Sequence, residues 1–213
     1  VPLISKGLNF AAKAVINGRV SAEFIIDTGS SFTIISEKMA RRIGFKDMGD
    51  APRYPVSTTA GEAWLRLVVF ESVNVGGAIS RNVEGAVSSY LGENMDGAIG
   101  LSFLNDFIYK FNGKKKELTL KRINGAGPLK GERGREWWSV KFGRYSKAIS
   151  RYTSYLQSHE NRLKARNVEQ ENSEKRFTEN DLKKIIRYYE KLYRILDKSA
   201  QIAGVPESWK AYP

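Results

Sequence analysis

The chain has 213 residues, of which 41% are apolar and 27% charged, a composition typical of a folded protein with a core and one that excludes disordered or collagen-like chains. There is no cysteine and only one histidine, His159, which excludes disulfides and cysteine-based sites and leaves little material for a Ser-His-Asp triad or a multi-histidine metal site. The formal net charge is +12, and residues 126–213 hold 19 Lys and Arg against 11 Asp and Glu, an excess that predicts an anionic surface or an acidic protein as neighbour.

Residues 1–123 contain the short apolar or alternating runs that are typical of β-strands. Asn17-Gly18 is a strong hairpin signal between two of these runs, and Gly76-Gly77 marks another break. Short helical turns are expected only at residues 37–43 and 103–109. The expected strands cover residues 9–16, 20–26, 33–35, 63–75, 82–87 and 117–120. The sequence therefore predicts a small all-β domain over residues 1–123.

Residues 124–135 are rich in glycine and charge and predict a linker, after which the apolar period becomes helical. The first helical stripe consists of Trp138, Phe142, Tyr145, Ile149, Tyr152, Leu156 and Leu163. A second helix is expected to begin at Thr178, with Asp181 as its capping partner, and to stop at Gly204. We expect an accessory or regulatory helical hairpin over residues 136–213, with the aromatic stripes as its core and His159 on its solvated surface.

One short motif carries chemistry. Asp27-Thr28-Gly29-Ser30 forms a turn between two runs that both predict buried strands. A carboxylate in such a place is costly unless it has hydrogen-bond partners or a function. The structural alternative is a β-turn in which Asp27 only bonds its own backbone.

This motif resembles the signature of the aspartic proteases, and the order of later segments resembles the retropepsin-like family of bacterial type over about residues 5–122. Thr59, Ala60, Gly61 and Glu62 resemble the flap hairpin that covers the substrate. Ala98, Ile99 and Gly100 resemble the apolar-Gly segment, and residues 111–120 resemble the closing strand. The resemblance implies an all-β retropepsin-like aspartic protease domain followed by the α-helical hairpin, α+β overall.

The resemblance also implies a mechanism. With one motif per chain, a homodimer would bring two Asp27 carboxylates together, sharing one proton and activating water to cut a polypeptide. Thr28 would brace the two loops, Gly29 would contact the substrate through its backbone, and Ser30 would hydrogen-bond Asp27. No metal and no organic cofactor is required.

Two other functions stay open. The β domain could be a protease fold that only binds, although the intact motif argues against this. Alternatively, the basic helical module at residues 126–213 could be the functional part and bind an anionic surface or partner. The chain begins at Val1 and not at Met, so we expect an upstream segment to have been removed. The resemblance to bacterial family members suggests the envelope, either periplasmic or tethered to a membrane and facing outside the cytoplasm.

Overall fold

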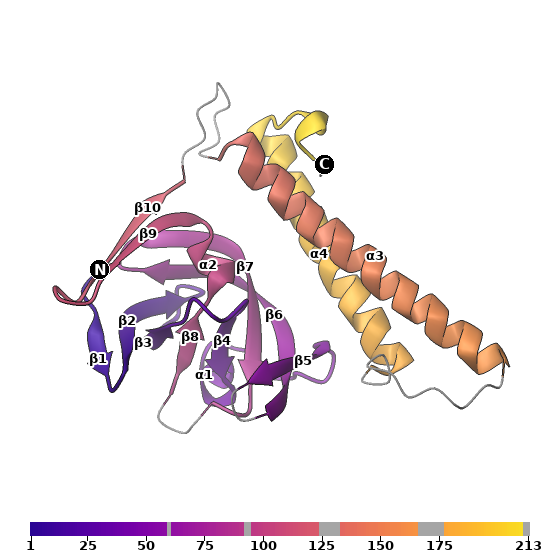
Figure 1. Ribbon diagram of the computed structural model, residues 1–213, viewed down its shortest axis with the longest axis horizontal. Helices are drawn as coiled ribbons and strands as arrows, with labels where there is room; N and C mark the ends of the chain where they lie inside the picture. Colours follow the sequence, from indigo (N-terminus) through magenta and orange to yellow (C-terminus); the bar gives the residue numbers. More distant parts are fainter. Residues whose placement is uncertain (59–60, 92–94, 124–132, 166–176, 211–213) are drawn as a thin grey trace. The chain divides into compact units, whose positions relative to one another are not determined.

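The computed structural model describes residues 1–58, 61–91, 95–123, 133–165 and 177–210, with side chains of the first long helix described up to residue 161. The chain divides into two compact units, Val1–Ala51 with Val56–Ile123, and Pro52–Pro55 with Asn124–Pro213 (Figure 1). The first unit is rich in β-strands and the second in α-helices, so the chain is α+β as predicted. The predicted linker lies largely outside the described residues, and the predicted domain boundaries stay predictions.

Strands and two short helices make up the chain as far as residue 123. In chain order they are β1 (Ile4–Lys6), β2 (Asn9–Ile16), β3 (Val20–Ile26), β4 (Thr33–Ser36), α1 (Glu37–Arg42), β5 (Arg53–Thr58), β6 (Gly61–Val75), β7 (Ala78–Ser88), β8 (Gly97–Ile99), α2 (Leu101–Leu104), β9 (Phe107–Asn112) and β10 (Glu117–Arg122).

The main sheet closes on itself. Its strand order is β1-β2-β3-β8-β4-β7-β6-β5, and β2 also pairs with β6, so β2, β3, β8, β4, β7 and β6 form a closed ring. The two predicted Gly-containing turns lie at its hairpins. Asn17 and Gly18 have φ of 52° and 64°, and Gly76 and Gly77 have φ of 58° and 91°. Positive φ at both central residues is the geometry that matches the twist of paired strands.

Alternating side chains of the ring strands fill its core. On β2, Ala12, Ala14 and Ile16 are buried, and the large buried side chains around them include Phe24, Phe70 and Phe103. The Phe70 ring lies over Gly85, a diagonal neighbour on β7, and it fits only because a Cβ at Gly85, which would lie 2.1 Å from the ring, is absent. Close packing of this kind makes the ring a rigid support for the loops at its ends.

The structure corrects part of the predicted pattern. The predicted helical turn at residues 103–109 is wrong in extent, because α2 ends at Leu104 and Phe107 begins β9. The β-favouring residues Phe107, Ile108, Tyr109 and Phe111 pair in register with β10, and this pairing determines their conformation. The predicted closing strand at residues 111–120 is therefore a two-stranded hairpin. Strands β1, β5 and β8 were not predicted.

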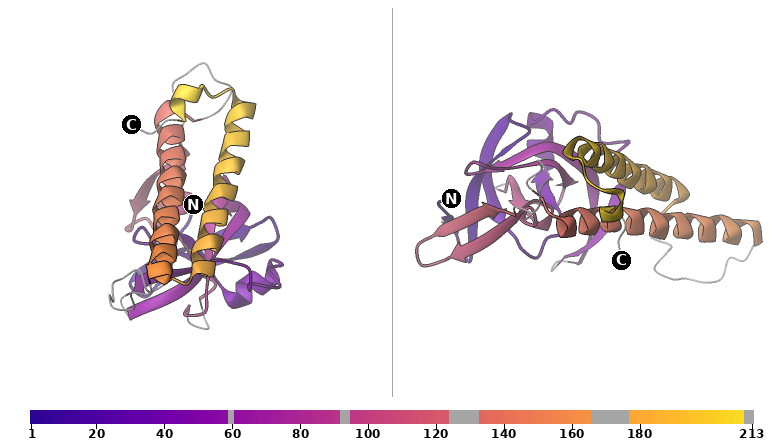
Figure 2. Two further views of the ribbon diagram at one scale, coloured as in Figure 1. Left: turned by 90° about the vertical axis from the view of Figure 1, so that its right-hand side faces the viewer. Right: turned by 90° about the horizontal axis from the view of Figure 1, so that it is seen from above.

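The second unit contains α3 (Arg135–Ala165), α4 (Glu179–Ala203) and a short 3-10 turn, η2 (Glu207–Trp209). The helices run side by side (Figure 2). They are joined by aromatic pairs: Phe142 meets Tyr193 with ring centroids 5.2 Å apart, and Tyr152 stacks on Tyr189 at 6.2 Å. As the residue number increases along α3, from Phe142 to Tyr152, the number of its partner on α4 decreases, from Tyr193 to Tyr189, so the two helices are antiparallel. The aromatic stripes form the core that the sequence predicts.

Both ends of α4 follow the predicted capping pattern. Thr178 and Asp181 form a reciprocal capping box at the start, and Gly204, with φ of 68°, ends the helix. His159 on α3 is half-buried, with its Nδ1 atom buried, so the predicted position on the solvated surface holds only for part of the side chain. No helix within the described ranges is both long and apolar enough to cross a membrane.

We expect Thr178→Ala to lower the midpoint temperature at which the helical hairpin unfolds. The substitution removes the side-chain acceptor for the Asp181 N–H and a partner of the Asp181 carboxylate, a loss worth about 0.5–2 kcal/mol. The measurement is unfolding followed by far-ultraviolet circular dichroism.

Ser154→Ala on the exposed face of α3 is the matched control, and we expect no loss there because alanine is the better helix former. Equal stability of the two variants would show that the capping box does not stabilise the hairpin.

Candidate active site

Asp27 lies directly after β3, where the β3–β8 ladder ends. Its backbone N–H donates to the Ile99 carbonyl at 3.0 Å and so continues the ladder by one bond. Asp27 is half-buried as a residue, and its Oδ1 accepts the Gly29 N–H at 2.9 Å. The bond to its own backbone that the structural alternative requires is therefore present. It uses one carboxylate oxygen, and the other, Oδ2, has no hydrogen-bond partner among the residues the structure describes.

The topology forces the Asp27 loop to cross the end of β8. Strand β8 pairs in parallel with β3 and antiparallel with β4, so it lies between the two strands that the loop connects. At the crossing point stands Gly100, where a Cβ would lie 2.1 Å from the Phe32 carbonyl oxygen and 2.7 Å from the Ser30 carbonyl oxygen. Backbone atoms cannot move aside as a flexible side chain would, so this position requires glycine.

Two further backbone hydrogen bonds hold the loop against α2. The N–H groups of Leu101 and Ser102 donate to the carbonyl oxygens of Ser30 and Ser31, at 2.8 and 3.1 Å. The carboxylate of Asp27 is thus carried by a loop that is bonded on one side to β8 and on the other to α2.

A buried pair of hydroxyl groups completes this support. The Thr33 N–H donates to Ser102 Oγ at 2.8 Å, and Ser102 Oγ donates to Thr33 Oγ1 at 3.2 Å. Thr33 Oγ1 also accepts the Gly100 N–H at 3.3 Å. Both side chains are nearly inaccessible to solvent. The sequence predicted no role for Thr33 and Ser102, although the placement of two hydroxyl residues within apolar runs was a signal that could have found them.

The structure brings most of the predicted motif residues together. Thr28 and Gly29 are exposed next to Asp27, and Ala98 and Ile99 pair with the last residues of β3. The Ser30 hydroxyl donates to the Phe32 carbonyl at 2.8 Å. A hydroxyl has one hydrogen to donate, so in the single chain it does not donate to Asp27. The bond from Ser30 to Asp27 stays a prediction for the assembled site.

The predicted flap lies on the β5–β6 hairpin. Thr58 Oγ1 donates to the Gly61 carbonyl at 2.7 Å, and Gly61 has φ of 112°, a value that glycine adopts without strain. Glu62 is exposed at the start of β6. Thr59 and Ala60 lie outside the described residues, so the assignment of this hairpin as a substrate cover stays a prediction.

The described side chains contain no group of three His, Asp or Glu residues that could hold a metal ion. The chemistry available at the site is that of a carboxylate beside exposed backbone. The Asp27 carboxylate can accept a proton from water or bind a hydrogen-bond donor of a ligand.

Residues 12–106 match a family model described as "gag-polyprotein putative aspartyl protease", and this range contains Asp27, the β5–β6 hairpin and Gly100. The chain resembles the retropepsin-like aspartic proteases over this part. That confirms the resemblance seen in the sequence, as a partial one. The helical unit lies outside the match.

Two solved structures are also similar to part of the chain. A retropepsin-like aspartic protease from Rickettsia conorii is 24% identical, covering 56% of this chain and 98% of its own, with a TM-score of 0.44. The retroviral protease-like domain of Ddi1 from Leishmania major is 22% identical, covering 54% of this chain and 90% of its own, with a TM-score of 0.40. No curated protein sequence matches the chain.

We expect Gly100→Ala to displace the Asp27 loop and to destabilise the β unit. The new methyl group overlaps backbone atoms of Phe32 and Ser30, and overpacking of this kind costs about 1–3 kcal/mol or more. Urea unfolding of the full chain would measure the loss.

Gly113→Ala is the control, because a Cβ there would meet the Phe111 ring at an ordinary 3.7 Å. If both substitutions had equal effects, the close crossing at Gly100 would not be what constrains the loop.

Proposed function

We propose that the β unit is an aspartic endopeptidase that works as a homodimer, with one Asp27 from each chain in a shared site. The observation that carries the proposal is the Asp27 loop, which presents a carboxylate and whose backbone is hydrogen-bonded to both β8 and α2. The partial family resemblance supports the same activity. A single chain supplies one such loop, and the mechanism needs two carboxylates.

The proposed reaction is direct attack by water on the peptide bond. Two carboxylates within a few ångströms cannot both carry a charge easily, so the pair retains one proton. The ionised carboxylate removes a proton from a bound water, and the water oxygen attacks the carbonyl carbon. The protonated carboxyl group donates to the carbonyl oxygen. The C–N bond then breaks as the leaving nitrogen takes the proton that the first carboxylate had removed from water, and the second carboxylate regains its proton from the former carbonyl oxygen.

The proposed substrate is an extended polypeptide that lies beneath the β5–β6 hairpin. Such a segment can pair through its backbone as an added strand, which gives affinity, while pockets for its side chains give preference. The exposed backbone of Gly29 supports this mode, since a residue without a side chain permits close approach.

Asp27→Asn should abolish cleavage of a mixed peptide library without unfolding the protein. Asparagine keeps an oxygen that can accept the Gly29 N–H, but it cannot take a proton from water. General acid–base catalysis contributes about 10²- to 10⁴-fold, and we expect a loss of at least this order.

Asp47→Asn is a close control. Its Oδ1 accepts the Gly49 N–H at 2.7 Å, which reproduces the Asp-x-Gly turn of Asp27 away from the site. Loss of activity in both variants would point to a turn-stability effect, and full activity of Asp27→Asn would reject the mechanism.

Mixing tests the shared site. After subunit exchange of equal amounts of wild-type and Asp27→Asn chains, only about one quarter of the dimers carry two Asp27 residues. We therefore expect about one quarter of the activity of the same total amount of wild-type chain. An activity of about one half would mean that each chain acts independently. Sedimentation velocity on each protein would show whether both form dimers.

A further inference from the structure

The solvent side of α4 carries a regular row of cations. Arg187, Lys191, Arg194 and Lys198 follow one another at spacings of four, three and four residues, and all four are exposed. These spacings place them on one face of the helix, at about one residue per turn. The row, called here the α4 basic face, extends over about 16 Å at a rise of about 1.5 Å per residue.

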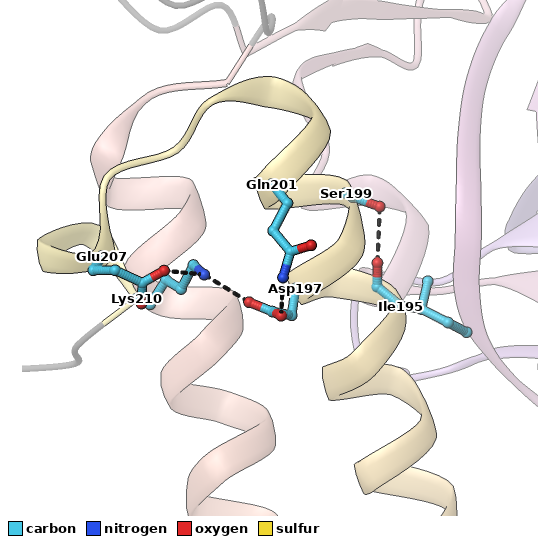
Figure 3. A network of polar contacts seen from close by, with 6 residues as sticks. All are labelled: Ile195, Asp197, Ser199, Gln201, Glu207 and Lys210. Atoms are coloured by element: carbon cyan, nitrogen blue, oxygen red, sulfur yellow. Dashed lines mark hydrogen bonds and ion pairs between the residues drawn. The ribbon is translucent and has the colours of Figure 1, made fainter.

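The acids of the same helix are largely engaged elsewhere. Glu179 pairs with Lys183, and Asp181 belongs to the capping box. Asp197 accepts from Lys210 at 2.7 Å and from Gln201 at 2.8 Å, so its carboxylate joins α4 to the segment after it (Figure 3). Only Glu190, among the acids of α4, is left to offset the basic face.

The four cations have no hydrogen bond or ion pair with any residue that the structure describes. Neighbouring cations in the row lie about one turn apart, a repulsive arrangement that destabilises an isolated helix slightly. A helix usually relieves such repulsion by placing acids between the cations, as Glu179 and Lys183 do one turn earlier. Within the described residues, Glu190, three residues after Arg187 and four before Arg194, is the one acid of α4 left to offset the row, so the basic face retains a clear excess of positive charge.

The apolar side of α4 is not available to a partner. Its buried residues are Leu182, Ile185, Tyr188, Tyr189, Leu192, Leu196 and Ala200, and Tyr189 contacts Tyr145 and Tyr152 of α3. An interfacial helix binds a bilayer by inserting its apolar face, and α4 could do so only by separating from α3. What α4 offers to solvent along the basic face is charge and hydrogen-bond donors.

From these observations we propose that the α4 basic face binds the phosphate backbone of a nucleic acid. Phosphates are regularly spaced along a nucleic-acid strand, and the cations are regularly spaced along α4. Each cation can therefore pair with one phosphate. The two guanidinium groups, of Arg187 and Arg194, can each bind a phosphate through two parallel hydrogen bonds. Lys191 and Lys198 add point charges between and beyond them.

This contact reads the backbone and not the bases. No aromatic side chain lies in the row to stack on a base, so binding is independent of sequence and dominated by the release of counterions. The inference is separate from the proposed peptidase activity, since it uses no residue of the Asp27 loop.

The test is a titration of a short, fluorescently labelled DNA duplex with the full chain at several salt concentrations. In the variant with Arg187→Gln, Lys191→Gln, Arg194→Gln and Lys198→Gln, we expect weaker binding and a flatter salt dependence. Each lost phosphate contact removes about 0.9 from the slope of log K against log salt, so the slope should fall by about 3 to 4. Glu190→Gln removes the one opposing charge and should strengthen binding.

A second quadruple variant removes the same number of charges elsewhere. Lys110, Lys114, Lys115 and Lys121 are exposed on the β9–β10 hairpin, and their replacement by glutamine should leave the slope unchanged. An equal fall in both variants would overturn the proposal in favour of diffuse attraction by net charge. Absence of duplex binding, or tighter binding to phosphatidylserine vesicles that the α4 substitutions weaken, would also overturn it. Circular dichroism confirms that each variant is folded.

Discussion

The crossing of the Asp27 loop over the end of β8 is the constraint on which the candidate site depends. Two chain segments must pass within van der Waals contact, and they do so because Gly100 has no side chain. Close approach then allows the hydrogen bonds that tie Ser30 and Ser31 to α2. Asp27 is therefore held by backbone geometry, and its position does not depend on a long side chain finding the right rotamer.

Backbone support of this kind matters for the proposed peptidase activity. A catalytic carboxylate must be held within a fraction of an ångström of its partner, and elements of regular structure do this better than flexible loops. The buried hydroxyl pair of Thr33 and Ser102 fixes the strand on the far side of the loop in the same way. Replacing either residue by an apolar one would leave a buried polar group without its partner. The free-energy cost of that unpaired group exceeds the net stabilisation that the hydrogen bond provides.

Local signals in the sequence predicted local features well. The Asn17-Gly18 and Gly76-Gly77 turns, the Thr178–Asp181 capping box and the aromatic stripes of α3 and α4 all depend on residues a few positions apart. The Asp27 motif could be recognised for the same reason. What the sequence did not predict depends on partners far along the chain. Strand β9 exists because β10 pairs with it, and the Thr33–Ser102 pair joins residues 69 positions apart.

The pairing of the first residues of the chain with β10 also bears on the order of folding during synthesis. The Leu3 N–H donates to the Lys116 carbonyl at 2.8 Å and the Leu118 N–H to the Val1 carbonyl at 2.9 Å, so these bonds join the two extremes of the β unit. A ribosome must release the chain to beyond residue 118 before they can form, whereas the contacts of the helical hairpin are more local and such contacts form faster. Until then the nascent β unit has exposed strand edges. We expect folding of the β unit to be the rate-limiting step in folding of the whole chain.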